Sequence, residues 1–224
     1  SVNAVVSANL ITDFALDAWT VGFLTSTYFL TFTVAQLPIG IALDRFGPRR
    51  TECVLLLFTA IGALIFALAN SIGQLSLGRA LIGFGVASCL MASFHAFAIW
   101  SPQARLPFLN GAVMAVGALG SVAATLPVAW AVETIGWRQL FFLLSATTLF
   151  IAVIIYFLVP EKEQPQNSLR LRETVSGMQY IFKSKLFWSV LPFSVAHQGS
   201  YIAIQSLWAG PWLSDVAGLN SALV

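Results

Sequence analysis

The chain has 224 residues, of which 58% are hydrophobic and only 9% are charged. Soluble domains carry about 25% charged residues, so this composition excludes a protein that covers its surface with polar groups. The formal net charge is +2, and the two cysteines, Cys53 and Cys89, lie inside apolar runs. Neither feature predicts a nucleic-acid partner, a cofactor or a metal site.

Six runs of the chain contain no Asp, Glu, Lys or Arg and are long enough to cross a bilayer. They are residues 18–43, 53–78, 80–104, 106–132, 139–160 and 186–214. A helix that spans the hydrocarbon core needs about 20 mostly apolar residues. The strands of a membrane β-barrel would alternate polar and apolar residues over about ten positions. The sequence therefore predicts an all-α membrane protein.

Polar breaks between the runs predict the helix ends. We expect a first helix that ends near Ile11, then helices at about 20–43, 52–69, 73–98, 107–131, 138–159 and 186–208. Residues 1–11 are too short to span a bilayer, the chain starts without Met, and it stops at Val224. We therefore expect a partial chain.

Basic residues gather in the loops on one side of the predicted bundle. If every helix crosses once, the loops at 44–51, 99–106 and 160–185 share a face. Nine of the eleven Lys and Arg residues lie there: Arg45, Arg49, Arg50, Arg105, Lys162, Arg170, Arg172, Lys183 and Lys185. The opposite loops hold only Arg138, and Arg79 lies inside a helix. The positive-inside rule predicts that the basic face is cytoplasmic.

Three motifs carry a resemblance to a known family. The loop between helices two and three reads Gly40-x-x-x-Asp44-Arg45-x-Gly47-x-Arg49-Arg50, and helix four reads Leu75-x-x-x-Arg79-x-x-x-Gly83-x-Gly85. The phrase Gly136-Trp137-Arg138 precedes helix six. Together with the helix order and the long central loop, these motifs resemble the major facilitator superfamily over essentially the whole chain. The resemblance implies two six-helix bundles that hold a solute between them and rock to transport it.

The resemblance also implies a division of the chain. Residues 1–159 would form the first transmembrane bundle, from the end of helix one to helix six. Residues 160–185 would form a cytoplasmic central loop, in which Val175, Met178 and Phe182 share one face of an amphipathic helix. Residues 186–224 would hold helix seven and the following segment of a truncated second bundle. The missing second bundle of the same chain is then a partner, beside the lipid bilayer and the solute.

The loop motif predicts a gate. In the family the residue that matches Asp44 locks the two bundles together, which implies the same role here, with Arg45 and Arg49 as its charge partners. Gly40 and Gly47 would permit close helix approach and a tight turn. The alternative is a solvated basic loop whose arginines, Arg50 among them, only set the topology. That alternative requires neither the acid nor the glycines.

Arg79 is the one basic residue inside a predicted span. A cation at the centre of a membrane helix costs about 2.5–3.5 kcal/mol on the insertion scale unless it pairs or reaches water. One reading is that Arg79 binds an anion or takes part in coupling to proton movement. The other is a structural anchor to backbone carbonyls or to the interface.

Two polar stripes are further candidates for solute or proton-coupling residues. On helix seven His197, Tyr201 and Gln205 follow one another at intervals of four, and helix two carries Tyr28 and Gln36. Such stripes line a wet cavity or make hydrogen bonds between helices, and both readings stay open. The glycines of helix five, Gly111, Gly117 and Gly120, predict close helix packing.

The sequence therefore predicts a secondary active transporter that moves a small solute across the bacterial cytoplasmic membrane by alternating access, with or without a coupled proton. The alternative is a transporter-like sensor that binds its solute and signals through a partner protein. A membrane enzyme is not expected, because the chain has no HExxH motif and no Ser and His pair at a plausible depth. Arg79 favours an anionic or neutral solute.

Overall fold

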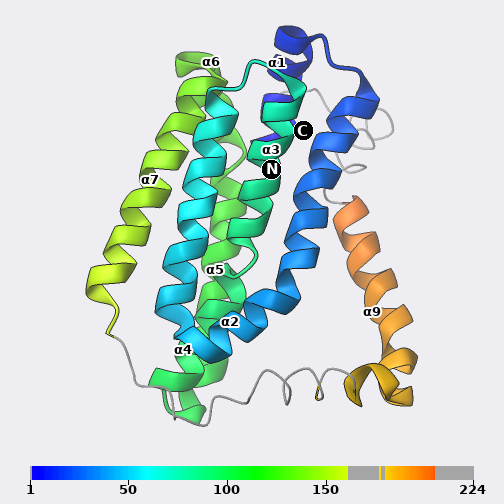
Figure 1. The fold of residues 1–224 in the computed structure, drawn as a ribbon, viewed down its shortest axis with the longest axis vertical. Helices are drawn as coiled ribbons and strands as arrows, with labels where there is room; N and C mark the ends of the chain where they lie inside the picture. Colours follow the sequence, from blue (N-terminus) through cyan, green and yellow to red (C-terminus); the bar gives the residue numbers. More distant parts are fainter. Residues whose placement is uncertain (1, 161–176, 178–179, 205–224) are drawn as a thin grey trace. The chain divides into compact units, whose positions relative to one another are not determined.

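The computed structural model describes residues 2–160, 177 and 180–204. Every element in these residues is a helix, which confirms the expected all-α class (Figure 1). The chain divides into two compact units, Ser1–Ser168 and Leu169–Val224. The first unit holds all but one of the labelled helices and carries most of the predicted site.

The first unit begins with a short helix and a long bent one. Helix α1 is Val2–Phe14, and α2 is Ala18–Ala67. Asp17 caps α2, because its side chain accepts a hydrogen bond from the Thr20 N–H. A straight helix of 50 residues would be about 75 Å long, far more than the roughly 30 Å of a bilayer core. The bend at Gly47 solves this, since it divides α2 into two arms, residues 18–46 and 48–67 (Figure 1).

The prediction of a loop over residues 44–51 is therefore wrong, because the turn is much shorter. Helical structure continues on both sides of Gly47, which alone has non-helical dihedral angles, φ 78° and ψ 166°. Pro48 lacks an N–H, so it suits the first turn of the second arm and would disrupt a helix interior. A glycine and a proline together make the turn in place of a loop.

The predicted helix at 73–98 is two helices, α3 (Ile72–Val86) and α4 (Cys89–Trp100). The break lies at Ala87 and Ser88, where the Ala87 N–H bonds to the carbonyl of Phe84 and not to that of Gly83, the partner in a regular α-helix. No proline marks this break, so the residue pattern alone reads as one continuous helix.

The predicted helix at 107–131 is also divided, into α5 (Leu106–Ala123) and α6 (Leu126–Ile135), after a short 3-10 turn at Gln103–Arg105. Pro127 stands in the first turn of α6, where its missing N–H costs nothing. Nothing lies within 4 Å of a Cβ built on Gly111, Gly117 or Gly120. The expected close packing at these glycines is absent from the described residues.

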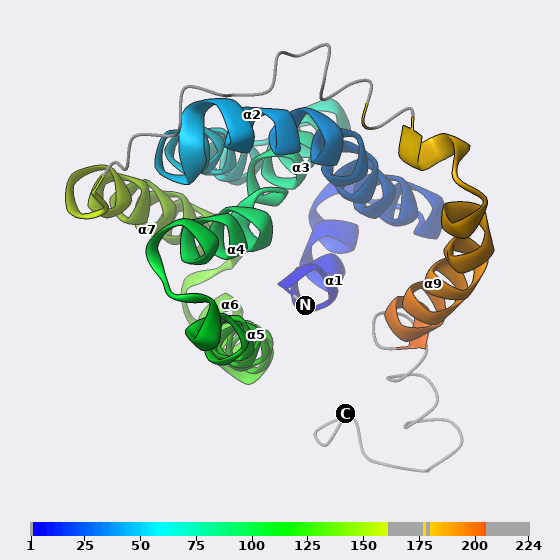
Figure 2. The ribbon, with the colours of Figure 1, turned by 90° about the horizontal axis from the view of Figure 1, so that it is seen from below.

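Helix α7, Trp137–Leu158, completes the first unit. The main packing is of α2 against α3 and α7, and Figure 2 shows α3 lying against α2 while α5 and α6 lie together. One hydrophobic cluster is rich in aromatic residues and includes Phe66, Trp137 and Phe141. A second cluster is built from smaller residues and includes Ala35, Ala87 and Ala92.

Four helical segments among the described residues are long and apolar enough to cross a membrane. They are Trp19–Ala67, Ile72–Trp100, Gln103–Ala123 and Trp137–Leu158. The first contains both arms of α2. Many large apolar side chains on these segments are exposed, as Val116, Leu119 and Phe157 are, which suits a lipid solvent.

The second unit contributes helix α9, Lys185–Ala203, which is the described part of the helix expected at 186–208. It is not among the four segments, since its second half contains the polar run His197-Gln198-Gly199-Ser200. Most of the expected amphipathic helix of the central loop lies outside the described residues.

Candidate functional site

The loop motif forms a joint at one end of the first unit, which we define as residues 44–52. Gly47 has a positive φ of 78°, a conformation that favours glycine, so the expected tight turn is confirmed. The Thr51 hydroxyl donates to the carbonyl of Ala42 at 3.1 Å and ties the two arms together. Nothing lies within 4 Å of a Cβ built on Gly40, so no close helix approach occurs there in the described residues.

Asp44 faces α4 rather than an arginine. Its Oδ1 lies 4.0 Å from His95 Nδ1, and its side chain is 58% exposed. The two expected charge partners instead lie over aromatic rings, Arg45 at 5.3 Å from the centre of Phe46 and Arg49 at 4.9 Å from that of Tyr156. Tyr156 belongs to the last turns of α7, so the joint, the end of α4 and the end of α7 share one end of the unit. Within the described part of the chain, Asp44 thus has one long contact and much open surface.

A second carboxylate of the joint was not among the predicted site residues. Glu52 Oε2 accepts a 2.6 Å hydrogen bond from the hydroxyl of Ser88, which is fully buried at the break between α3 and α4. Glu52 stands directly before a charge-free run, which is the one sequence signal that could have marked it. Its partner depends on how α2 and α3 pack, which no spacing reveals.

Arg79 lies in the buried face of α3, about 10 Å from the helix start at 1.5 Å per residue. Its side chain is only 7% exposed. The guanidinium lies 4.5 Å from the ring centre of Phe66 and 5.6 Å from that of Phe141. Among the described residues it makes no hydrogen bond and no ion pair, and Tyr28 of α2 is its electrostatic neighbour.

The other residues of the helix-four motif bring α3 close to α2. Leu75 is fully buried, and Gly83 and Gly85 are buried as well. A Cβ on Gly83 would collide with the backbone carbonyl of Tyr28, and one on Gly85 with Thr59. The motif is therefore a packing face that carries one buried cation.

The Gly136-Trp137-Arg138 motif forms a clasp at the opposite end of the unit, together with Asp13. Gly136 has a positive φ of 81° and makes the turn into α7. The Trp137 indole N–H donates to Asp13 Oδ2 at 2.8 Å, and Arg138 donates to the carbonyls of Ala67 and Ala69 at 2.9 and 2.8 Å. Arg138 thus satisfies carbonyls that the end of α2 leaves without helical partners. Asp13 was missed because the first helix was expected to end near Ile11.

These motifs and the fold agree with the comparison to known families. A model of the Major Facilitator Superfamily matches residues 1–224. The chain belongs to the major facilitator superfamily. This superfamily is one of membrane transporters and not of enzymes, and the chain is accordingly a multi-pass membrane protein.

Several curated members of the superfamily are similar to the chain. The MFS-type transporter grgE of Penicillium sp is 30% identical over 175 residues, which cover 77% of this chain and 31% of that protein. The probable sulfoacetate transporter SauU of Cupriavidus necator is 27% identical over 77% of this chain and 41% of its own length. The nitrate/nitrite transporter NrtP of Nostoc punctiforme is 30% identical over 70% and 32%. The chain spans about a third to two fifths of the length of these relatives.

The two polar stripes have different outcomes within this superfamily member. On α2 the Gln36 side chain donates to the carbonyl of Ala87 at 3.4 Å, and Tyr28 packs its ring against Phe32. Gln36 therefore serves a contact with the end of α3, while the ring contact of Tyr28 lies within α2 itself. On α9 His197 is exposed and lies beside Phe193, and Tyr201 follows one turn later. Gln205 lies outside the described residues.

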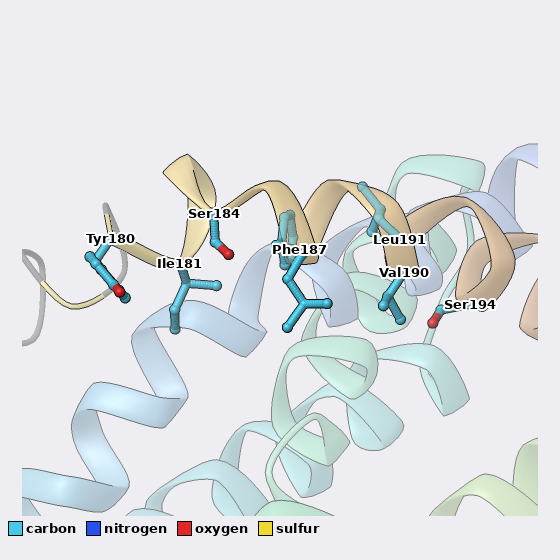
Figure 3. A pocket seen from close by; sticks show the side chains of 8 residues that line it. Tyr180, Ile181, Ser184, Phe187, Val190, Leu191 and Ser194 are labelled. Atoms are coloured by element: carbon cyan, nitrogen blue, oxygen red, sulfur yellow. The ribbon is translucent and has the colours of Figure 1, made fainter.

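Each unit has a hollow on its described surface. The first, of about 460 Å³, lies between the arms of α2 and is lined by apolar side chains with Arg50 and Thr51 at the joint. The second, of about 490 Å³, follows α9 and the turn before it (Figure 3). Its labelled side chains are mostly apolar, with Ser184 and Ser194 among them. No group of three or more metal-ligating side chains occurs in the part of the chain that the structure describes.

Proposed function

We propose that the chain is the first-bundle part of a secondary active transporter that carries a small anionic solute across the bacterial cytoplasmic membrane. The observation that carries the proposal is Arg79, a cation in a membrane-spanning helix with no acidic partner among the described residues. A buried guanidinium is costly unless an anion or polar group meets its donors, and it can bind carboxylate or sulfonate with two parallel hydrogen bonds.

The aromatic neighbours of Arg79 are suited to such a role. Phe66 and Phe141 hold the guanidinium by their ring faces, and this contact uses none of its N–H donors. The group is thereby held in place and kept available for an anion. Related proteins are named for sulfoacetate, nitrate and nitrite, and galacturonate, all of which are anions at neutral pH.

Asp44 supports transport by alternating access. Its carboxylate is more than half exposed and has a single contact, at 4.0 Å, with the described residues, so it can change partners at little cost. We assign it to a latch between this bundle and the second one, on the cytoplasmic side that the basic loops favour. Movement of a solute against its gradient then requires a second gradient, for which a proton is the simplest candidate.

The test is uptake by the purified protein in proteoliposomes. Sulfoacetate, nitrate and galacturonate are compared with a neutral sugar, with and without a pH gradient. We expect uptake of one or more anions but not of the sugar, and a loss of at least about tenfold in Arg79→Gln, because one buried charge-assisted contact is removed. Arg105→Gln is the matched control, since Arg105 is exposed at the start of α5. A stable Arg79→Gln protein with wild-type anion uptake contradicts the proposal.

A further inference from the structure

The break between α3 and α4 is held by side chains from both arms of α2. From the first arm, Gln36 donates to the carbonyl of Ala87 at 3.4 Å. From the second arm, Glu52 accepts the hydroxyl hydrogen of Ser88 at 2.6 Å. Ser88 is fully buried, and its own carbonyl accepts the Ala92 N–H at 2.7 Å in the first turn of α4. The break is therefore a defined feature with assigned partners.

The same joint meets α4 a second time, two turns further on. His95 Nδ1 lies 4.0 Å from Asp44 Oδ1. The two carboxylates of the joint thus contact α4 at its beginning and near its end. The first contact is short and part-buried, and the second is long and more exposed. The direction in which α4 leaves α3 decides where His95 stands, so the first contact controls the second.

Stability alone gives a poor reason for a carboxylate at this place. Glu52 is half-buried, Leu55 of the apolar cluster follows it on α2, and Ala87 of the same cluster precedes its partner Ser88, so a carboxylate here loses part of its solvation. An apolar side chain of similar size would pack there at no such cost. A short hydrogen bond to a carboxylate does provide a fixed direction, because it is stronger than one between neutral groups.

We propose that Glu52 is a positioning residue of the transport cycle: through Ser88 it sets the angle between α3 and α4, and through α4 it sets the position of His95 beside Asp44. The transport part of this inference rests on the proposed function. The positional part does not, since it concerns the geometry of one helix break.

The positional part is tested by a distance measurement. Spin labels are placed on Leu77 of α3 and Ala98 of α4, which are both exposed, in the intact protein in a background otherwise free of cysteine. We expect one narrow distance distribution in the parent protein and in Glu52→Gln, whose amide oxygen still accepts from Ser88. We expect a broadened or shifted distribution in Glu52→Ala and in Ser88→Ala. An unchanged distribution in Glu52→Ala overturns the proposal.

The transport part is tested with the same variants in proteoliposomes. We expect Glu52→Ala and Ser88→Ala each to lower the maximal uptake rate about tenfold with KM changed less than twofold, and the double variant to be no worse than either single one. Glu52→Gln should keep most of the rate. Fully additive losses, or a lower melting temperature with a normal rate, contradict a positioning role. If the parent protein moves no solute, the proposed function fails while the distance measurement still decides the geometry.

Discussion

Asp13 at the clasp and Asp44 at the joint, one acid at each end of the first unit, are held in opposite ways. At the clasp, Asp13 accepts a 2.8 Å hydrogen bond from a buried indole, and Arg138 saturates two helix-end carbonyls. At the joint, Asp44 has a 4.0 Å contact with His95 and remains largely exposed. Asp13 therefore makes a fixed hydrogen bond, whereas Asp44 makes a weak contact that it can exchange for another. The clasp can keep helices together through a transport cycle, while the joint can give up one partner for another.

The hydrophobic packing near the two ends also differs, and it is tighter near the clasp than near the joint. The cluster near the clasp contains interlocking aromatic rings, with Phe66 and Phe141 only 4.4 Å apart between ring centres. The cluster near the joint consists mainly of alanine and aliphatic residues, which offer smaller contact surfaces. Tight aromatic packing resists relative movement of helices, and small side chains leave it less restricted. We therefore expect changes at the joint to alter transport and changes at the clasp to alter stability.

The largest expected effect is on transport at the joint. Asp44→Asn keeps the size of the side chain but removes the charge that a latch requires. We expect uptake to fall by about tenfold or more, as for the loss of a coupling between two states, with little change in melting temperature. The measurements are proteoliposome uptake and thermal unfolding in detergent. Normal uptake at normal abundance in the membrane would show that the loop only sets topology.

The bend at Gly47 is expected to give the next largest effect. At φ 78° and ψ 166° an alanine is strained by about 2 kcal/mol, so Gly47→Ala should lower the unfolding temperature and also the uptake rate. Gly40→Ala is the matched control in the same motif, because a Cβ there meets nothing within 4 Å. Equal stability of the two variants would mean that the bend is not required.

A smaller effect on stability alone is expected at the clasp. Trp137→Phe keeps an aromatic ring in the cluster but removes the N–H that Asp13 accepts, at a cost of about 1–2 kcal/mol. Uptake at a temperature well below unfolding should stay near the wild-type rate. Trp130→Phe serves as the control, since Trp130 is 69% exposed. A transport defect without a stability defect would reverse the assignment of the two ends.

Much of the fold could be predicted from the sequence because membrane helices depend on a simple property. Lipid excludes charge, so charge-free runs mark the spans and basic residues mark the loops. Arg49 of the joint lies over Tyr156 near the end of α7, so these two helix ends meet as expected, while most of the basic central loop lies outside the described residues. The break before Pro127 also had a local cause that the sequence displays.

The details of the site could not be predicted, because they depend on how helices rotate and approach one another. Gly40 and Gly47 belong to one motif, yet only the second needs a glycine conformation. The break at Ser88 has no proline, and its stabilising partner, Glu52, comes from 36 residues earlier in the chain. Asp44 meets His95 where arginines were expected, since Arg45 lies over Phe46 instead.

The smallest expected effect concerns Asp17, an acid near the clasp whose partner is local. Its hydrogen bonds from Thr20, first the hydroxyl and then the backbone N–H, lower the pKa of the Asp17 carboxyl below its ordinary value. A lowered folded-state pKa stabilises the protein above the unfolded-state pKa, and this contribution is lost as pH falls through the folded value. Asp17→Ala should therefore lower the melting temperature by about 2 °C at pH 7, and the difference should shrink below about pH 4.

Asp17→Asn is the control, because its amide oxygen still caps α2 and does not titrate in this range. It should melt close to wild type at pH 7, where capping by Asp and Asn is about equal. A large transport defect in Asp17→Ala would show that Asp17, like Asp44, takes part in transport. If Asp17→Ala transports normally, the role of an exchangeable contact stays with Asp44 at the joint, whose exposed carboxylate faces another helix and not its own.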